Sequence, residues 1–329
     1  MKRLIAYLLL TAMLFTLVGC GPKSETGEGD AVAQATTEAT VPEPTESPEE
    51  ANVLKIMILG SSRSVNTFQL LYEVFKDQMP EQELVLGIMY YSGCSMKMHV
   101  DFIKSNANVY DYYRNDSGRW EIFKESTMEQ GLRDQNWDVI LLQAGTGDLD
   151  NRMNETARIF LKDYVDQNVQ HPHKLWWHST WFNSTDPSLY DPTKTKLDPH
   201  TIDQYAQLTS SNTAATAYVL DDPMFAGHIT SGTPMMYALK ILNVPEVDLY
   251  RDHTHLSDFG CLLVGYAWYA QFTGKKVEEI NLTTIPVHLR HTKYQNLGEM
   301  IVTDEMKQII MDTVDYTLDN PWAIPRAGQ

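Results

Sequence analysis

The feature that most constrains the fold is an apolar run that ends at glycine and is followed by a helical pattern. Residues 53–59 are rich in β-forming apolar side chains, and the chain then reads Gly60-Ser61-Ser62. Large apolar side chains recur over residues 65–79 at the three- to four-residue spacing of an amphipathic helix. A strand, a tight turn and a helix in this order are typical of a βαβ unit, so the pattern predicts a parallel sheet.

The same order recurs along the rest of the chain. We expect further strands at residues 83–90, 137–143, 174–178 and 218–220. We expect further helices at residues 154–169 and 201–217, from about residue 257 onwards, and at 303–318. The aromatic-rich stretch 109–125, with Asn115-Asp116-Ser117-Gly118 at its centre, is expected to form a hairpin. The length after residue 52 would also allow two small domains, but no second linker appears, so we expect one α/β domain.

Ser62, Asp252 and His255 are candidates for a catalytic triad. A serine hydroxyl is a poor nucleophile at neutral pH, so it needs an imidazole to accept its proton and a carboxylate to orient that imidazole. Ligands of open α/β sheets bind where the carboxyl ends of the strands meet, and Ser62 follows such an end. Asp252 and His255 are three residues apart before a helix, so both side chains can lie on one side of the turn. We therefore expect Ser62 as nucleophile, His255 as base and Asp252 as orienting acid.

Two other interpretations of these segments stay open. A Gly-Ser-Ser-Arg-Ser turn after a strand also suits phosphate binding of the flavodoxin type. The polar segment near residue 252 could simply precede a helix that is capped by Ser257 or Asp258. Ser61 and Ser64 compete with Ser62 as nucleophile, although we expect Ser64 to cap the first helix and Arg63 to be solvated.

The first 52 residues are predicted to contribute nothing to the core. Lys2 and Arg3 precede an apolar stretch, residues 4–17, that is too short to span a bilayer. Gly19-Cys20 then resembles the lipobox of bacterial lipoproteins, so we predict a signal peptide over residues 1–19 and lipid on Cys20.

Residues 20–52 are rich in Thr, Glu and Pro and lack aromatic side chains, as expected of a disordered acidic tether. Residues 53–329 would then form the single folded domain. Several acyl chains on one cysteine give lasting attachment, so the predicted location is extracytoplasmic and anchored to the cell membrane.

The charge of the chain narrows the choice of partners. The formal net charge of −17 becomes −19 once the two positive charges of Lys2 and Arg3 are removed. A strongly acidic protein is repelled by nucleic acid and by other anionic polymers. Neutral sugars or small esters therefore fit better as ligands, while the sequence gives no indication of an oligomeric state.

The cysteines and histidines suggest neither a disulfide framework nor a metal centre. Beyond Cys20 the chain has only Cys94 and Cys261, which could form one bridge or none. The histidine pairs do not belong to a set of three or four ligands at an established spacing, so we predict no metal and no other cofactor. His99 and His178 are expected to be hydrogen-bonded polar residues.

Four segments resemble, in order, the conserved blocks of the SGNH, or GDSL-like, hydrolase superfamily. They are residues 58–62, 92–95, 143–148 and 252–257. The resemblance covers most of the chain after the tether and is closest to exported bacterial families without an assigned substrate. It implies a three-layer α/β/α, flavodoxin-like sheet of about five parallel strands, a cofactor-free esterase reaction, and the same triad that the residues suggest.

The resemblance also implies an oxyanion hole, with one departure. In the superfamily, the backbone N–H groups of the positions matching Ser62 and Gly93 stabilise the oxyanion together with an asparagine side chain. Gly147 stands at the asparagine position in this chain. Losing one such donor typically lowers the rate about 10²- to 10³-fold, so we expect the Gln143 side chain to replace it.

Trp177 and Trp181 follow the fourth expected strand and are weak candidates for stacking on a sugar, with core packing as the alternative. Together these features predict an exported, membrane-anchored serine esterase that removes a small acyl group, such as acetyl, from a carbohydrate or related ester. The alternative is a catalytically weak or inactive scaffold protein that binds or assembles surface glycans, which Gly147 favours.

Overall fold

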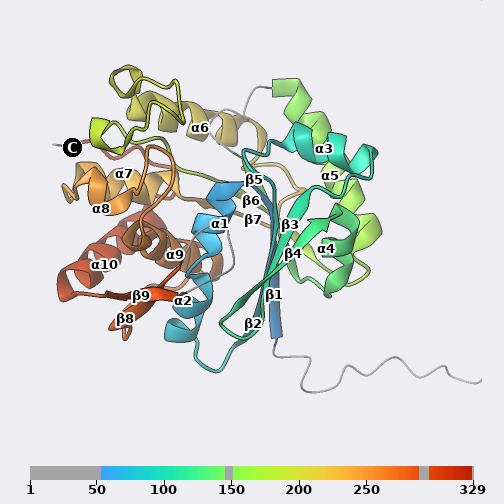
Figure 1. Ribbon diagram of the computed structural model, residues 1–329, viewed down its shortest axis with the longest axis horizontal. Helices are drawn as coiled ribbons and strands as arrows, with labels where there is room; N and C mark the ends of the chain where they lie inside the picture. Colours follow the sequence, from blue (N-terminus) through green and yellow to red (C-terminus); the bar gives the residue numbers. More distant parts are fainter. Residues whose placement is uncertain (1–52, 145–150, 289–295, 328–329) are drawn as a thin grey trace, which may run out of the picture. The chain divides into compact units, whose positions relative to one another are not determined.

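The computed structural model describes residues 53–144, 151–288 and 296–327 (Figure 1). The predictions for residues 1–19, for Cys20 and for the 20–52 tether lie outside the described residues, as does Gly147. All described residues belong to one unit, Glu46–Gln329. In this part of the chain no helix is both long enough and apolar enough to cross a membrane.

A seven-stranded sheet in the order β4-β3-β2-β1-β5-β6-β7 lies at the centre. Its strands are β1 (Val53–Gly60), β2 (Glu83–Tyr90), β3 (Tyr110–Asn115), β4 (Trp120–Ser126), β5 (Val139–Ala144), β6 (Lys174–Ser179) and β7 (Gly227–Thr230). The five strands β2, β1, β5, β6 and β7 pair in parallel, whereas the β3–β4 hairpin extends the sheet antiparallel to β2. A separate antiparallel pair is formed by β8 (Thr284–His288) and β9 (Asn296–Ile301). The expected mostly parallel α/β fold is confirmed.

Helices cover both faces of the sheet. They are α1 (Ser62–Phe68), α2 (Leu71–Gln78), α3 (Met96–Lys104), α4 (Met128–Asp134), α5 (Asn151–Asn168), α6 (Gln204–Tyr218), α7 (Gly232–Lys240), α8 (Glu246–Leu249), α9 (Asp258–Thr273) and α10 (Asp304–Asp319). In Figure 1, α3, α4 and α5 lie on one side of the sheet, while α1, α2, α7, α9 and α10 lie on the other. The sheet and its two helical layers therefore give the expected three-layer arrangement.

Alternation along the central strands separates two hydrophobic cores. In β1, Ile56 and Ile58 belong to the core under α1 and α9, whereas Met57 and Leu59 belong to the core under α3 and α5. A strand that is buried on both faces reads as a continuous apolar run, which is why residues 56–59 are all apolar. Most of α9 is buried as well, and the segment that enters this helix contacts α1, since the Leu256 N–H donates to Asn66 Oδ1 at 3.4 Å.

Two expected elements differ from the structure. The single helix expected at residues 65–79 is interrupted between α1 and α2, where the Gln69 carbonyl accepts a hydrogen bond from the Trp120 indole. The prediction of a strand at residues 218–220 was wrong. The backbone N–H groups of Val219 and Leu220 both donate to the Ala215 carbonyl at the end of α6. The strand beside β6 is instead β7, which has only four residues and begins at a glycine. Such a short run gives little periodic signal.

Candidate functional site

The turn after β1 presents one of its serines and buries the other two. Ser61 is the N-cap of α1, because its Oγ accepts the Arg63 backbone N–H, so the expectation that Ser64 caps this helix was wrong. Ser61 and Ser64 are buried, whereas Ser62, the first residue of α1, is partly exposed. Ser62 is therefore the serine whose hydroxyl can meet a substrate.

Gln143, near the end of β5, is hydrogen-bonded to the turn that follows β1, which we call the nucleophile turn. Its Oε1 accepts hydrogen bonds from the Ser61 N–H, the Ser61 Oγ and the Ser64 Oγ, each at 2.9 Å. A backbone N–H can only donate, so this contact fixes which end of the amide is the oxygen. The side chain is only 3% exposed. Gln143 thus positions the nucleophile turn, a contact that the sequence pattern did not reveal, and the expected oxyanion role of its Nε2 group stays a prediction.

Gly60 is required by the same packing. A Cβ atom at this position would lie 2.1 Å from Ser64 Oγ and 2.6 Å from Gln143 Oε1. Because neither atom can move without breaking the hydrogen bonds under the turn, Gly60→Ala is expected to destabilise the fold by about 1–3 kcal/mol and to lower any activity at Ser62. Chemical denaturation measures the first effect.

The matched control is Gly265→Ala in α9, where the new Cβ would lie 3.3 Å from Val74 Cγ2 and the helix would gain a better helix former. This control should be close to neutral. A Gly60→Ala protein as stable and as active as the Gly265→Ala protein would contradict the packing described for the turn.

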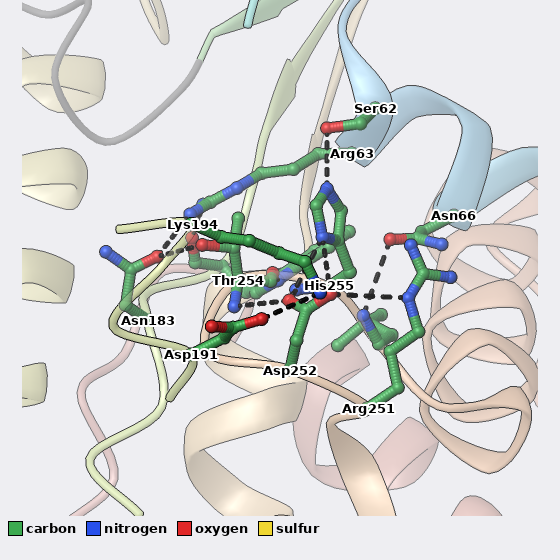
Figure 2. A network of polar contacts seen from close by, with 12 residues as sticks. Ser62, Arg63, Asn66, Asn183, Asp191, Lys194, Arg251, Asp252, Thr254 and His255 are labelled. Atoms are coloured by element: carbon green, nitrogen blue, oxygen red, sulfur yellow. Dashed lines mark hydrogen bonds and ion pairs between the residues drawn. The ribbon is translucent and has the colours of Figure 1, made fainter. Parts of the chain in front are cut away.

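Ser62, His255 and Asp252 form a continuous hydrogen-bonded relay (Figure 2). Ser62 Oγ lies 2.9 Å from His255 Nε2, and His255 Nδ1 lies 3.0 Å from each carboxylate oxygen of Asp252. An ionised carboxylate can only accept, so Nδ1 carries the ring proton and Nε2 accepts from the serine hydroxyl. The structure therefore brings together the three side chains that the sequence suggested, in the order that nucleophile activation requires.

The surroundings of Asp252 keep its carboxylate ionised. Burial alone would raise the pKa of Asp252, but hydrogen bonds from the His255 ring and from the backbone N–H groups of Thr254 and His255 hold that pKa well below its usual range. These N–H groups lie 2.9 and 2.8 Å from Asp252 Oδ1. The Arg251 Nε atom lies 3.5 Å from the other carboxylate oxygen. Asp252 is thus an anion oriented by its own loop.

Backbone contacts close the 250–256 loop around this carboxylate. Tyr250 and Leu256 form an isolated antiparallel bridge, and the Arg251 N–H donates to the His255 carbonyl at 3.0 Å. Ser257 then caps α9 by accepting the Gly260 N–H. The segment therefore does precede a capped helix, as the alternative interpretation held, while its His255 also contacts Ser62 and its Asp252 contacts His255.

Gly93 lies in an exposed turn next to the nucleophile turn. The Cys94 N–H donates to the Tyr91 carbonyl at 3.2 Å, and Gly93 has a φ of +61°, which favours glycine. The Tyr91 N–H donates to the Gly60 carbonyl at 3.3 Å, so the loop after β2 lies against the turn after β1. This places the Gly93 segment beside the Ser62 segment, as an oxyanion hole built from both would need.

The two tryptophans proposed to bind sugar are buried instead. Trp177 and Trp181 are both 0% exposed. The Trp177 indole donates to Ser179 Oγ at 3.0 Å, and the Trp181 indole donates to the Thr254 carbonyl at 2.8 Å. A buried ring face cannot stack on a ligand, so the sugar-binding prediction for both residues was wrong and core packing was the correct alternative.

The other histidines and cysteines of interest are buried as well. Burial lowers the pKa of His99 to about 4 and that of His178 to about 3, so both rings are neutral; they contact Tyr110 Oη and Ser231 Oγ, respectively. Cys94 and Cys261 are buried thiols that are not joined to each other. Within residues 53–144, 151–288 and 296–327, no group of three or more His, Cys, Asp or Glu side chains could hold a metal ion.

The contacts of Arg63 were also missed by the sequence reasoning. Arg63 was expected to be solvated, but its side chain is only 8% exposed. Its guanidinium contacts Thr180, Trp181 and Asn183, which lie 117–120 residues further along the chain. An arginine in the first turn of a helix carries no sequence signal for such distant partners.

Comparisons with known proteins place the chain in a family. A model described as "Domain of unknown function (DUF4886)" matches residues 55–296. The chain is similar to the crystal structure of a DUF4886 family protein from Bacteroides uniformis, with 20% identity and a TM-score of 0.63, over 84% of this chain and 98% of that one. At this identity, the similarity shows that the two proteins share a fold. No curated protein matches the chain.

Two further solved structures share less with it. An acetyl xylan esterase is 14% identical with a TM-score of 0.38, over 64% of this chain and 96% of that one. A protein described as a GDSL-like lipase from Parabacteroides merdae is 11% identical with a TM-score of 0.39, over 68% of this chain and 96% of that one. Because the family model spans most of the described residues, this chain belongs to the DUF4886 family.

Proposed function

We propose that this protein is an extracytoplasmic, membrane-anchored serine esterase that removes a small acyl group, such as acetyl, from a carbohydrate or a related ester. The observation that carries the proposal is the relay from Ser62 Oγ through the His255 ring to the Asp252 carboxylate. This arrangement supplies a nucleophile, a base and an orienting acid in a site where Ser62 is accessible. The reaction needs no cofactor.

In the acylation step, Ser62 Oγ attacks the ester carbonyl carbon while its proton passes to His255 Nε2. The carbonyl oxygen takes up the negative charge, and the N–H groups of Ser62 and Gly93 are the proposed donors that stabilise it, with Gln143 Nε2 as a third candidate. Asp252 stabilises the imidazolium that forms. The bond between the carbonyl carbon and the alcohol oxygen then breaks, and the alcohol leaves with the proton from His255.

Deacylation repeats these steps with water. His255, now neutral, accepts a proton from a water molecule that attacks the acyl-enzyme carbonyl. Collapse of the second tetrahedral intermediate breaks the bond to Ser62 Oγ, which recovers its proton from His255, and the carboxylic acid is released. The enzyme returns to its starting protonation state, so the reaction is a balanced hydrolysis.

The proposed location and substrate class rest on the sequence. A lipid on Cys20 would hold the protein at the outer side of the cell membrane, with residues 20–52 as the tether. A strongly acidic, exported chain favours neutral ligands such as acylated sugars over anionic polymers. Replacement of the anchor residue, Cys20→Ala, should move the protein from the membrane fraction to the soluble fraction.

The pH dependence of kcat/KM follows from the depressed pKa of Asp252. Because hydrogen bonds hold the pKa of Asp252 well below its usual range, protonation of this carboxylate is not expected to add to a loss of activity in weakly acidic solution. The logarithm of kcat/KM should therefore fall with a slope of about one per pH unit. This slope is measured from initial rates with a 4-nitrophenyl ester. The product is read at a wavelength where its absorbance does not depend on pH. A slope that approaches two in weakly acidic solution would contradict the ionised carboxylate.

The substrate class is tested with two panels of esters. The full-length protein in mild detergent is given 4-nitrophenyl esters of increasing acyl length and, separately, acetylated oligosaccharides. We expect the acetyl ester to be the best of the first panel and acetate to be released from the second. If no ester is hydrolysed while the folded protein binds the oligosaccharides, the alternative is correct and the chain is a glycan-binding scaffold.

A further inference from the structure

We propose that Arg63 is a positioning residue that fixes the distance between Ser62 and His255 by joining the segments that carry them. The proposal rests on the esterase function above. We call the set Arg63, Trp181, Asn183 and Thr254 the loop brace.

The first half of the brace links the nucleophile turn to the loop that follows β6. Arg63 comes directly after Ser62, and its Nη1 donates to Thr180 Oγ1 at 3.1 Å and also to the Trp181 carbonyl. Its Nη2 donates to Asn183 Oδ1 at 2.8 Å. The guanidinium also lies over the Trp181 ring, 5.5 Å from the ring centroid. One side chain therefore contacts three residues of that loop, Thr180, Trp181 and Asn183.

The second half of the brace links the same loop to the segment that carries the base. The Trp181 indole N–H donates to the Thr254 carbonyl at 2.8 Å, and Thr254 Oγ1 lies 3.4 Å from Asn183 Oδ1. The Ser184 N–H also donates to the His253 carbonyl at 2.9 Å. Asn183 Oδ1 is thus shared between Arg63, which follows the nucleophile, and Thr254, which precedes the base (Figure 2).

The loop that Arg63 contacts, residues 180–185 after β6, is called the β6 loop. Its far end is also held by hydrogen bonds. Thr185 donates its backbone N–H and its hydroxyl to the Glu246 carboxylate, at 2.6 and 2.7 Å. The Gln204 side chain donates to the same carboxylate at 3.1 Å and to the Asn183 carbonyl at 3.1 Å. Because Glu246 opens α8, just before the 250–256 loop, the β6 loop serves as a fixed support between the two catalytic segments.

The chemistry of the contacts favours a geometric role over a stabilising one. The acceptors recorded for Arg63 are a hydroxyl, a carbonyl and an amide oxygen, all neutral. Burial lowers the pKa of Arg63 to about 10, so the group is still a cation at neutral pH. Burying a cation against neutral acceptors is costly, so these contacts offer little net stabilisation of the fold. What an apolar side chain cannot supply is the planar fork that reaches three acceptors at once.

The kinetic test compares three variants with the parent protein. Arg63→Met should fold, with kcat for an acetyl ester lowered on the order of 10²-fold and KM changed by less than about threefold, because a small misplacement of Ser62 affects the reacting geometry more than binding. Arg63→Lys, which keeps the charge but lacks the fork, should lose nearly as much. Arg158→Met is the matched control, since Arg158 is also buried and donates to the Tyr218 carbonyl away from the site.

Three kinetic outcomes overturn the proposal. These are an Arg63→Met enzyme with unchanged kcat, a full recovery in Arg63→Lys, and an equal loss in Arg158→Met. If Arg63→Met does not fold, Asn183→Ala removes the shared acceptor instead. It should lower kcat in the same way, and Asn183→Asp, which restores the Oδ1 acceptor, should recover most of that loss. Equal rates in these two Asn183 variants also overturn the proposal.

A structural readout separates failure of the brace from failure of the proposed function. Crystal structures of the parent and of Arg63→Met give the Ser62 Oγ–His255 Nε2 distance, which is 2.9 Å here and should exceed the hydrogen-bonding limit of about 3.5 Å in the variant. If the parent hydrolyses no ester, the function is wrong but this distance still tests the brace. An unchanged distance in the variant overturns the brace whatever the activity.

Discussion

Ser62→Ala is expected to lower kcat for an activated acetyl ester by about 10⁴-fold or more, and His255→Ala should lower it to a similar level. The reason is that Ser62 Oγ and His255 Nε2, 2.9 Å apart, act as one unit. Without the imidazole the hydroxyl keeps its proton, and without the hydroxyl the imidazole has nothing to activate. The double variant should therefore be no slower than either single variant.

Steady-state hydrolysis of 4-nitrophenyl acetate measures these losses, with thermal unfolding to show that each variant is folded. His253→Gln is the matched control. This histidine lies in the same loop and stacks on Tyr190, with ring centroids 5.1 Å apart, but it has no part in the relay. It should retain kcat within about threefold, as substitutions outside a catalytic unit usually do. A Ser62→Ala enzyme as fast as the parent would exclude the proposed nucleophile.

Asp252→Asn is expected to lower kcat by about 10⁴-fold while the fold is kept. The structure gives a specific reason. The backbone N–H groups of Thr254 and His255 donate to Oδ1, so an asparagine must place its own oxygen there. Its Nδ2 then takes the place of Oδ2, 3.0 Å from His255 Nδ1, and donates to the ring. The imidazole is held with its proton on Nε2, where it cannot accept the proton of Ser62.

The ring tautomer is read from the ¹⁵N chemical shifts of His255 alongside kcat. Asp258→Asn is the control, because Asp258 begins α9 and its carboxylate accepts a hydrogen bond from Gln69 at 3.1 Å, outside the relay. Its kcat should stay near the parent value. An Asp252→Asn enzyme with parental kcat and an unchanged tautomer would mean that the carboxylate does not orient the base.

The main features of the fold could be predicted from the chain because parallel sheets impose a visible pattern. Strands buried on both faces appear as apolar runs, and the first of them was followed directly by a turn and by helical spacing. The carboxyl ends of such strands share one edge, which places Ser62 at that edge, whereas the meeting of Ser62 with His255, 193 residues away, was expected from their chemistry and from the resemblance of residues 252–257 to the last SGNH block.

The features that failed depend on tertiary contacts that no local pattern records. Trp177 lies near the end of β6 and Trp181 just after it, and only the packing of distant segments decides that both rings are covered. The sequence predicts that Arg63 is an exposed helix residue, and only its contacts with the loop that follows β6 bury the side chain. Gln143 was expected to supply an oxyanion donor, but its contacts with Ser61 and Ser64 follow from the register of β1 against β5.

The central claim is that this relay makes Ser62, and no neighbouring serine, a nucleophile. The most direct measurement is the mass of the full-length protein after exposure to a fluorophosphonate, followed by mapping of the modified peptide. We predict one phosphonyl group on Ser62, slower modification in Asp252→Asn and none in Ser62→Ala. Modification of Ser61 or Ser64, or no modification under conditions that label a known serine hydrolase, would contradict the account.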